Sequence, residues 1–265
     1  MEKISNILKN QKTWPESTGN SSNSKPKPCP KCGQEIEPQV IPLAEREVYP
    51  ACVCEVEEYE REEDRKALEK KQEKVSRALK SSGLGKRFRG CSFENWKERE
   101  GTQKAHRAAL EYKNNLKENI GQGKGLIVFG QPGNGKSHLV AAIVNEAIRE
   151  GYVAVFEGVP RLLAKIRATY SGGTTSEGEI MQALTEADLL VLDDAGAEKL
   201  TAWTEPTLYT IIDDRYIEEK PVVITTNSDL DGLEEKLGYR AMDRLLEMCE
   251  IVENRGTSYR QERGR

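Results

Sequence analysis

Short apolar runs alternate with longer amphipathic stretches through the second half of the chain. The runs at residues 125–129, 153–157, 189–192 and 222–226 are continuous, which is typical of strands that are covered on both faces. The predicted helices cover residues 103–119, 136–150 and 161–169, a short segment that ends at residue 187, and residues 205–219. This order predicts an α/β fold in which helices flank a parallel sheet.

The first third of the chain has a different pattern. Residues 1–28 contain a stretch of mainly Ser, Asn, Pro, Lys and Gly, which cannot bury enough apolar surface to offset its ordering entropy, so we expect a flexible leader. Residues 59–84 are dominated by charge, and Leu68, Val75 and Leu79 give only a narrow apolar stripe at helical spacing. This segment is predicted to be a solvated connecting helix and linker.

The predicted strands all fall within residues 85–265, which we expect to form one large domain. Phe88, Phe93 and Trp96 near its start are predicted to be aromatic anchors that dock this segment onto the domain. The whole chain has 265 residues, and its apolar fraction of 37% can fill a core only if part of the chain stays solvated. A split architecture is therefore expected.

Charge and hydropathy narrow the possible classes of protein. The formal net charge of −4 argues against a uniformly basic nucleic-acid binder, although 40 Lys and Arg residues leave room for a local basic strip. No run approaches the length of a membrane span, and the first residues do not resemble a secretion signal. A cytoplasmic location without a membrane partner is expected.

A glycine-rich segment follows the first predicted strand and precedes a helix. Residues 130–137 match the pattern G-x-x-x-x-G-K-S, in which glycines let successive N–H groups face phosphate oxygens. The amine of Lys136 is predicted to contact the outer phosphates of ATP, and the hydroxyl of Ser137 to coordinate Mg²⁺. The predicted nucleotide-binding residues are Gly130, Pro132, Gly133, Asn134, Gly135, Lys136, Ser137 and His138. His138 directly follows the loop, and its side chain is expected to pack.

Polar side chains end two later strands. Asp193 and Asp194 follow the apolar run at 189–192, so Asp193 is predicted to hold Mg²⁺ and Asp194 to polarise the attacking water. Asn227 ends the run at 222–226, where its amide could hold that water or sense the γ-phosphate. The alternative for Asp194 and Asn227 is that each simply favours a turn.

Four of the six cysteines lie close together near the N-terminus. Cys29 and Cys32 form a C-x-x-C pair followed by glycine, and Cys52 and Cys54 form a tighter C-x-C pair. Four thiolates complete a tetrahedral Zn²⁺ site, so residues 29–58 are predicted to be a small zinc-binding module with a structural metal. Free thiols are the alternative.

Taken together, several motifs resemble those of the AAA+ helicase-loader family of DnaC and DnaI, which is related to the transposition helper IstB. Besides the glycine-rich loop and the Asp193–Asp194 strand, the motifs are Thr225-Thr226-Asn227, Arg240-Ala241-Met242-Asp243-Arg244 and Ser258-Tyr259-Arg260. The resemblance covers residues 85–265. It implies that Arg244 acts on the ATP of a neighbouring subunit and that Arg260 contacts nucleotide as a second sensor. The alternative for Arg240, Arg244 and Arg260 is a surface ion pair, which contributes little.

The same resemblance implies a function. We expect an ATPase that self-associates in its ATP state and loads the replicative hexameric helicase onto single-stranded DNA, with residues 29–58 gripping the helicase or nucleic acid. Residues 161–184 match the place of a DNA-channel helix, where Arg161, Lys165, Arg167 and Tyr170 suit phosphates and a base. The alternative is a charged helix face that is simply solvated. Asp194 stands where related ATPases carry a longer glutamate, so turnover is expected to be slow and stimulated by DNA or a partner. The alternatives are a transposition helper and a non-hydrolysing adaptor.

Overall fold

A computed structural model describes residues 25–41, 46–79, 84–172, 175–197 and 201–259 of the chain. The chain divides into two compact units, residues 1–64 and 65–265. Helix α2 (Val53–Leu79) contributes residues to both units. We describe each unit by itself.

The described part of the first unit consists of two small hairpins and the start of α2. Strand β1 (Lys27–Pro28) pairs with β2 (Glu35–Ile36), and β3 (Gln39–Ile41) pairs with β4 (Arg46–Val48), both in antiparallel fashion. Cys29 lies between β1 and β2, and it is one of the few buried side chains in this unit. The described residues of this unit therefore form almost no hydrophobic core.

The second unit is built on a five-stranded parallel sheet with the order β6-β7-β8-β5-β9. Its strands are β5 (Gly125–Phe129), β6 (Ala154–Gly158), β7 (Leu189–Ala195), β8 (Val222–Thr226) and β9 (Cys249–Glu253). The predicted α/β fold with a parallel sheet flanked by helices is confirmed. Strand β9 was not predicted, because its alternation of apolar and acidic residues gives no continuous apolar run.

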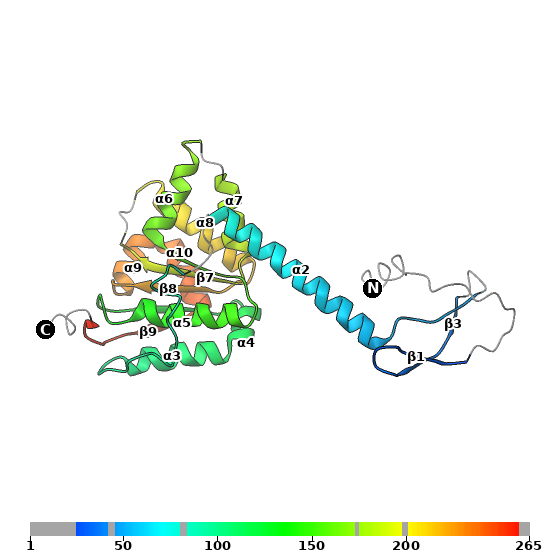
Figure 1. Ribbon diagram of the computed structural model, residues 1–265. Coiled ribbons are helices and arrows are strands. Elements are labelled where there is room, and N and C mark those ends of the chain that lie inside the picture. The colour runs from blue at the N-terminus through cyan, green and yellow to red at the C-terminus, as the bar shows by residue number, and fades with distance from the viewer. Residues whose placement is uncertain (1–24, 42–45, 80–83, 173–174, 198–200, 260–265) are drawn as a thin grey trace. The chain divides into compact units, whose positions relative to one another are not determined.

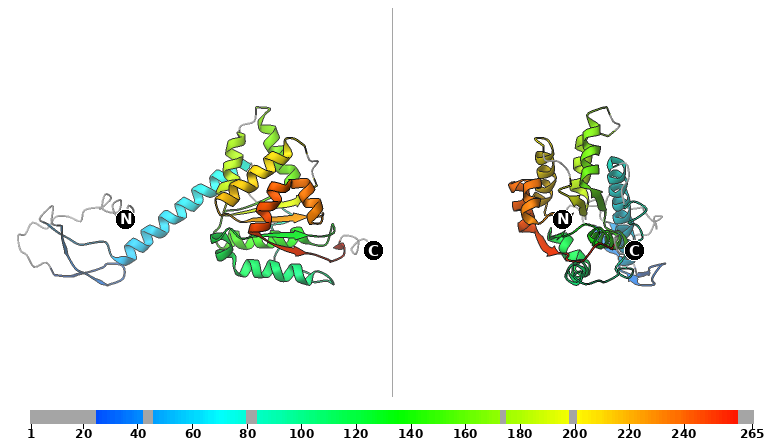
Figure 2. Two further views of the ribbon diagram at one scale, coloured as in Figure 1. Left: turned by 180° about the vertical axis from the view of Figure 1, so that it is seen from behind. Right: turned by 90° about the vertical axis from the view of Figure 1, so that its left-hand side faces the viewer.

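Helices cover both faces of this sheet (Figure 1). Side chains that alternate along each strand point to opposite layers: Ile127 joins the α6–α10 layer, whereas Leu126 and Val128 join the layer of α3, α4 and α5. The helices are α3 (Gln103–Asn114), α4 (Leu116–Gly121), α5 (Lys136–Arg149), α6 (Val159–Thr169), α7 (Glu177–Glu186), α8 (Thr204–Ile217), α9 (Leu230–Leu237) and α10 (Tyr239–Met248). Figure 2 shows the same two layers from behind.

Local sequence signals explain several helix ends. Ser176 begins α7 with a capping box, since its hydroxyl accepts from the Glu179 N–H and the Glu179 carboxylate accepts from the Ser176 N–H. The Asp229 carboxylate caps α9 by accepting from the Gly232 N–H. The single helix predicted over residues 103–119 is instead two helices, α3 and α4, which meet at Asn115.

The last turns of α2 pack onto the second unit, contrary to the prediction of a solvated helix. Val75, Ala78 and Leu79 are buried in the core layer that contains α6 and α7. Lys71 forms an ion pair with Asp188, and Lys74 lies 2.6 Å from Glu186. The narrow apolar stripe is therefore the docking face of this helix rather than an incidental pattern.

Arg215 in α8 is a charged residue that is fully buried. Its guanidinium donates to the carbonyl oxygens of Leu184 (2.6 Å), Ala187 (3.0 Å) and Pro221 (2.7 Å), so it satisfies the carbonyls at the end of α7. Burial lowers its pKa to about 9, which leaves it charged at neutral pH. Arg215 thus joins α7, α8 and the start of β8.

Among the helices that the structure describes, none combines the length and the apolar character that a membrane crossing requires.

Candidate nucleotide site

The glycine-rich loop connects the interior strand β5 to α5. Gly130, Gly133 and Gly135 have φ values of 140°, 81° and 102°, in a region that favours glycine, and Gly135 is the last residue before α5 begins. Lys136 is 5% exposed, and its ammonium lies 2.7–3.0 Å from the oxygens of Gly130, Gln131 and Asn227. The loop is thus curled around a buried cation beside a helix N-terminus, which fits a phosphate group.

Close packing explains why glycine stands at two of these positions. A Cβ on Gly135 would lie 2.6 Å from the ring of Trp96, and one on Gly130 would lie 2.2 Å from the carbonyl oxygen of Asn254. Trp96, Phe88 and Phe93 all pack on the core layer of α3 and α5, as predicted for the aromatic anchors. The loop is therefore held from outside by segments that precede and follow the sheet.

Asn134 in the loop is tied to Asn254, which follows β9. The Asn134 side-chain amide donates to the Asn254 carbonyl oxygen at 2.7 Å, and the Asn254 amide donates back to the Asn134 carbonyl oxygen at 3.3 Å. Both residues are almost completely buried. The predicted binding residue Asn134 is therefore a structural brace of the loop through its side chain.

Asp193 lies beside the loop at the end of β7. Its carboxylate accepts a hydrogen bond of 2.6 Å from the Thr225 hydroxyl and another from the Ser137 hydroxyl. Burial raises the pKa of Asp193, while Thr225, Ser137 and the nearby Lys136 counteract that rise. A hydroxyl and a carboxylate oxygen in contact are ligands that suit Mg²⁺, so the residues predicted for the metal lie together.

Asp194 and Asn227 meet at the same sheet edge. Asp194 has a φ of 58° at a register shift between β7 and β8, and its N–H donates to the Thr225 hydroxyl at 2.9 Å. The Asn227 amide donates to the Asp194 carboxylate at 2.5 Å, while its oxygen accepts from Lys136 at 3.0 Å. The structure therefore joins the ends of β7 and β8 to the loop in one hydrogen-bonded network.

Arg244 in α10 faces α8. Its guanidinium lies 3.0 Å from the Asp213 carboxylate and 4.5 Å from the centre of the Tyr216 ring, and the Asp213 contact raises its pKa. Its side chain is about one-third exposed. Arg260, the other predicted arginine, lies outside the described residues, and Tyr259 is the last described residue before it.

The predicted DNA-facing segment brings a cation and two aromatic rings together. Arg167 lies 4.6 Å from the centre of the Trp203 ring, and the Trp203 indole donates to the Tyr170 hydroxyl at 3.2 Å. Tyr170 is 58% exposed. Lys165 is directed elsewhere, because its ammonium lies 2.5 Å from Glu157 and donates to the Leu79 carbonyl oxygen at 3.0 Å.

The four N-terminal cysteines converge in the first unit. Their sulfur atoms all lie within 4.8 Å of one another, with Cys29 to Cys54 at 3.6 Å and Cys32 to Cys52 at 3.5 Å. A tetrahedral zinc–thiolate centre places its sulfurs roughly 3.8 Å apart. Backbone N–H groups lower the pKa of Cys29 to about 7, which favours the thiolate that metals bind, whereas burial raises the pKa of Cys54. The cluster could hold zinc. Cys52 directly precedes α2 and Cys54 is the second residue of that helix, so both thiols come from the helix start.

The structure also shows where His138 lies and which residues near the predicted sites the sequence did not reveal. The His138 ring packs edge-on against Trp96 at 5.4 Å and lies 3.0 Å from the Ser92 carbonyl oxygen, so it points to the domain interior. The sequence did not single out Trp203 or Asn254, nor the bridging role of Thr225. Asn254 directly follows β9, and that position would have marked it as a candidate neighbour of the glycine-rich loop. The sequence did not reveal β9, so this signal was missed.

This fold and site define a P-loop nucleotide-binding domain of the AAA+ class. The model of the IstB-like ATP binding protein family matches residues 60–265. The chain belongs to this family. It is also 32% identical over 173 residues to the replicative helicase loader DnaC of Escherichia coli strain K12, which corresponds to 65% of this chain and 69% of that protein.

Solved structures give the same result. The crystal structure of the DnaC helicase loader superposes with a TM-score of 0.59 at 25% identity and covers 64% of this chain and 100% of its own. The crystal structure of DnaI superposes with a TM-score of 0.56 at 25% identity, over 65% of this chain and 95% of its own. The predicted resemblance to this family is thereby confirmed.

Proposed function

We propose that this protein is an ATP-hydrolysing loader of a replicative DNA helicase. The observation that carries the proposal is the network from Lys136 through Asn227 to Asp194, which places a phosphate-binding cation, a polar amide and a carboxylate at one sheet edge. The similarity to the DnaC helicase loader supports the cellular role.

The residues of the site have separate roles in this proposal. The amides of residues 130–136 and the Lys136 ammonium bind the phosphates of ATP, and the oxygens of Ser137 and Asp193 hold Mg²⁺. Bound Mg²⁺ neutralises charge that develops on the phosphates. Asp194 orients the attacking water and accepts its proton, while the Asn227 amide fixes the carboxylate of Asp194.

Assembly and DNA binding involve surfaces beyond this edge. Arg244, held by Asp213 and Tyr216, completes the ATP site of a neighbouring subunit, and Arg260 contacts nucleotide within its own subunit. Single-stranded DNA contacts the group formed by exposed Arg167 and Tyr170 and half-buried Trp203, whose guanidinium and rings suit a phosphate and a stacked base. ATP-bound subunits then assemble around the DNA.

The cysteine module is proposed to bind zinc and to contact the helicase. When bound, zinc cross-links the hairpin that contains Cys29 to the start of α2, and this replaces the missing hydrophobic core. Exposed Val40, Val53 and Tyr59 in the same unit offer apolar surface for a protein partner.

A transposition helper is the second candidate, because the family description names IstB-like proteins. Such a protein would act with a transposase rather than a helicase. The third candidate, a non-hydrolysing adaptor, fits this site less well. A site that only binds nucleotide needs no carboxylate beside Asn227.

Co-purification with the replicative helicase of the host, with and without ATP, tests the proposal. We expect ATP-dependent assembly in the wild type and its loss in Lys136→Ala, because that variant lacks the phosphate-binding ammonium. Lys124→Ala is the matched control, since the Lys124 side chain is half exposed and pairs only weakly with Glu118 at 3.6 Å. Helicase binding that depends neither on ATP nor on Lys136 would contradict the loader mechanism. Capture of a transposase in place of the helicase would favour the second candidate.

A further inference from the structure

The segment after β9 runs along the outside of the glycine-rich loop. We call residues 254–259 the strap. The Tyr259 N–H donates to the Gly133 carbonyl oxygen at 2.9 Å, and a Cβ on Gly133 would lie 2.3 Å from the Ser258 hydroxyl oxygen. The strap and the loop are therefore in direct contact, with no room for a side chain between them.

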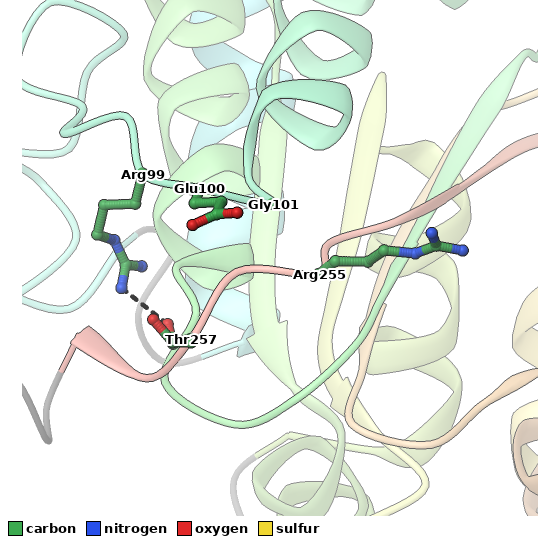
Figure 3. Close-up of a pocket in the computed structure, with 5 residues that line it drawn as sticks. All are labelled: Arg99, Glu100, Gly101, Arg255 and Thr257. Atoms are coloured by element: carbon green, nitrogen blue, oxygen red, sulfur yellow. Dashed lines mark hydrogen bonds between the residues drawn. The ribbon is translucent and has the colours of Figure 1, made fainter.

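Arg99 connects the loop to the strap. Its guanidinium donates to the Thr257 carbonyl oxygen at 2.7 Å and to the Asn134 carbonyl oxygen at 3.1 Å. It also lies 5.3 Å from the centre of the Tyr259 ring. Figure 3 shows Arg99 directed at Thr257, whereas the side chain of Arg255 in the same open pocket points away. One planar, fork-shaped group thus bridges two backbone segments that are far apart in sequence.

These contacts fix two consecutive peptide groups of the loop. In a planar trans peptide the C=O and the following N–H point in opposite directions. When Tyr259 holds the Gly133 carbonyl, the Asn134 N–H points away from the strap. When Arg99 holds the Asn134 carbonyl, the Gly135 N–H points away from Arg99. Both N–H groups belong to the stretch that cradles phosphate in a P-loop.

We propose that Arg99 is a positioning residue that clamps the strap onto the glycine-rich loop and so pre-orients the Asn134 and Gly135 amides for the phosphates of ATP. The inference rests on the proposed ATP binding and assigns part of its affinity to a residue outside the loop. Without the clamp, the Asn134 carbonyl keeps only the longer hydrogen bond from the Asn254 amide, so more of the loop's ordering falls to nucleotide binding, and that entropy weakens binding. Arg99 touches no reacting atom.

Nucleotide affinity tests the clamp. Arg99→Ala is expected to weaken both ADP and ATP about tenfold, because the oriented amides cradle phosphates that both nucleotides carry. The nucleotide affinity of Arg99→Lys is expected to lie between those of the wild type and Arg99→Ala. The lysine ammonium keeps the charge but does not span both carbonyls as the guanidinium does. Arg255→Ala is the matched control, because it also removes one arginine charge near the loop. The Arg255 side chain is 77% exposed and pairs with Glu253, so it does not bridge the strap and the loop. Unchanged affinity in Arg99→Ala, or an equal loss in Arg255→Ala, would overturn the proposal.

Tyr259 provides a second pair of variants. Tyr259→Pro removes the N–H that holds Gly133 and should weaken ADP as Arg99→Ala does. Tyr259→Ala keeps that N–H and should have a much smaller effect, because it loses only the ring contact. Equal effects of the two changes would mean that the backbone hydrogen bond does not orient the loop.

Hydrogen exchange without nucleotide separates this inference from the proposed function. In the folded, nucleotide-free protein, Arg99→Ala should speed exchange at the Tyr259 amide and leave the β8 amides unchanged. An unchanged Tyr259 rate would refute the clamp even if the protein binds ATP. A wild type that binds no nucleotide would instead refute the proposed function.

Discussion

The Thr225 hydroxyl stands between the two aspartates that follow β7. It donates to the Asp193 carboxylate and accepts from the Asp194 N–H, so a single oxygen orients one side chain and the backbone of the next residue. The left-handed backbone of Asp194 turns its side chain toward Asn227 rather than toward Ser137. Adjacent carboxylates thereby have different neighbours and, in our proposal, different roles.

Asp194→Asn is expected to abolish most ATP turnover and to leave nucleotide affinity nearly unchanged. An amide has nearly the same size but does not accept the proton of the attacking water, and a loss of about 10²-fold or more is typical for such a base. Steady-state phosphate release and nucleotide titration measure the two properties. Asp231→Asn, an exposed change in α9, serves as the control. Full turnover in Asp194→Asn would show that another group orients the water.

Residues of the site differ in how far the sequence reveals them. Lys136 and Ser137 belong to a local pattern, and Asp193 ends a recognisable strand, so short-range information was sufficient. The braces Arg99 and Asn254 contact the loop from 35 and 120 residues away in sequence. Only the folded sheet brings them to Asn134, and no local pattern marks an arginine or asparagine for such a contact.

At the scale of elements, the sheet order explains why the site forms where it does. Strand β5 lies between β8 and β9, and β8 separates it from β7. The loop after β5 therefore has Asn227 beside it on one strand and Asn254 on the other, with the aspartates one strand further. Strands β5, β6, β7 and β8 were predictable as continuous apolar runs, whereas β9 alternates apolar and acidic residues and is recognised only by its pairing with β5.

Helix α2 shows how a weak apolar stripe can be misread. Its mostly charged composition favours solvent, but the few apolar residues near its end are buried in the core layer that contains α6–α10. Burial of Val75 and Leu79 outweighs the solvation of their charged neighbours, because those long side chains remain at the surface and pair with residues such as Glu186.

Leu79→Ala is expected to lower the free energy of unfolding of the second unit by about 3 kcal/mol, since Leu79 is fully buried and its truncation leaves a cavity. Urea denaturation followed by tryptophan emission measures the change. Leu246→Ala is the matched control, because Leu246 is half exposed and should cost less than about 0.5 kcal/mol. Equal stability of the two variants would mean that the end of α2 is not part of the folded core.

At the scale of the whole molecule, the two units are stabilised by different means. The second unit has two buried hydrophobic layers, while the described part of the first unit offers little beyond the cysteine cluster. Small units without a core commonly depend on a metal, so their folding and their metal binding are one equilibrium.

Cys29→Ser is expected to reduce bound zinc from about one ion per chain to nearly none and to weaken helicase binding, with ATP affinity unchanged. Elemental analysis and nucleotide titration measure these quantities. Cys91→Ser is the control, because Cys91 packs in the second unit against the layer of α3 and α5. Equal zinc content in the two variants would exclude the cluster as the metal site, and a parallel loss of ATP affinity would show that the units do not work separately.

The distance of 120 residues between Asn134 and Asn254 also matters while the chain is being made. A ribosome adds about 5–20 residues per second, so the glycine-rich loop emerges roughly 6–24 seconds before its brace. During that interval the nascent chain has a phosphate-binding sequence but lacks β9 and the strap that shape it. The nucleotide site therefore takes its braced form only after β9 and the strap have also emerged.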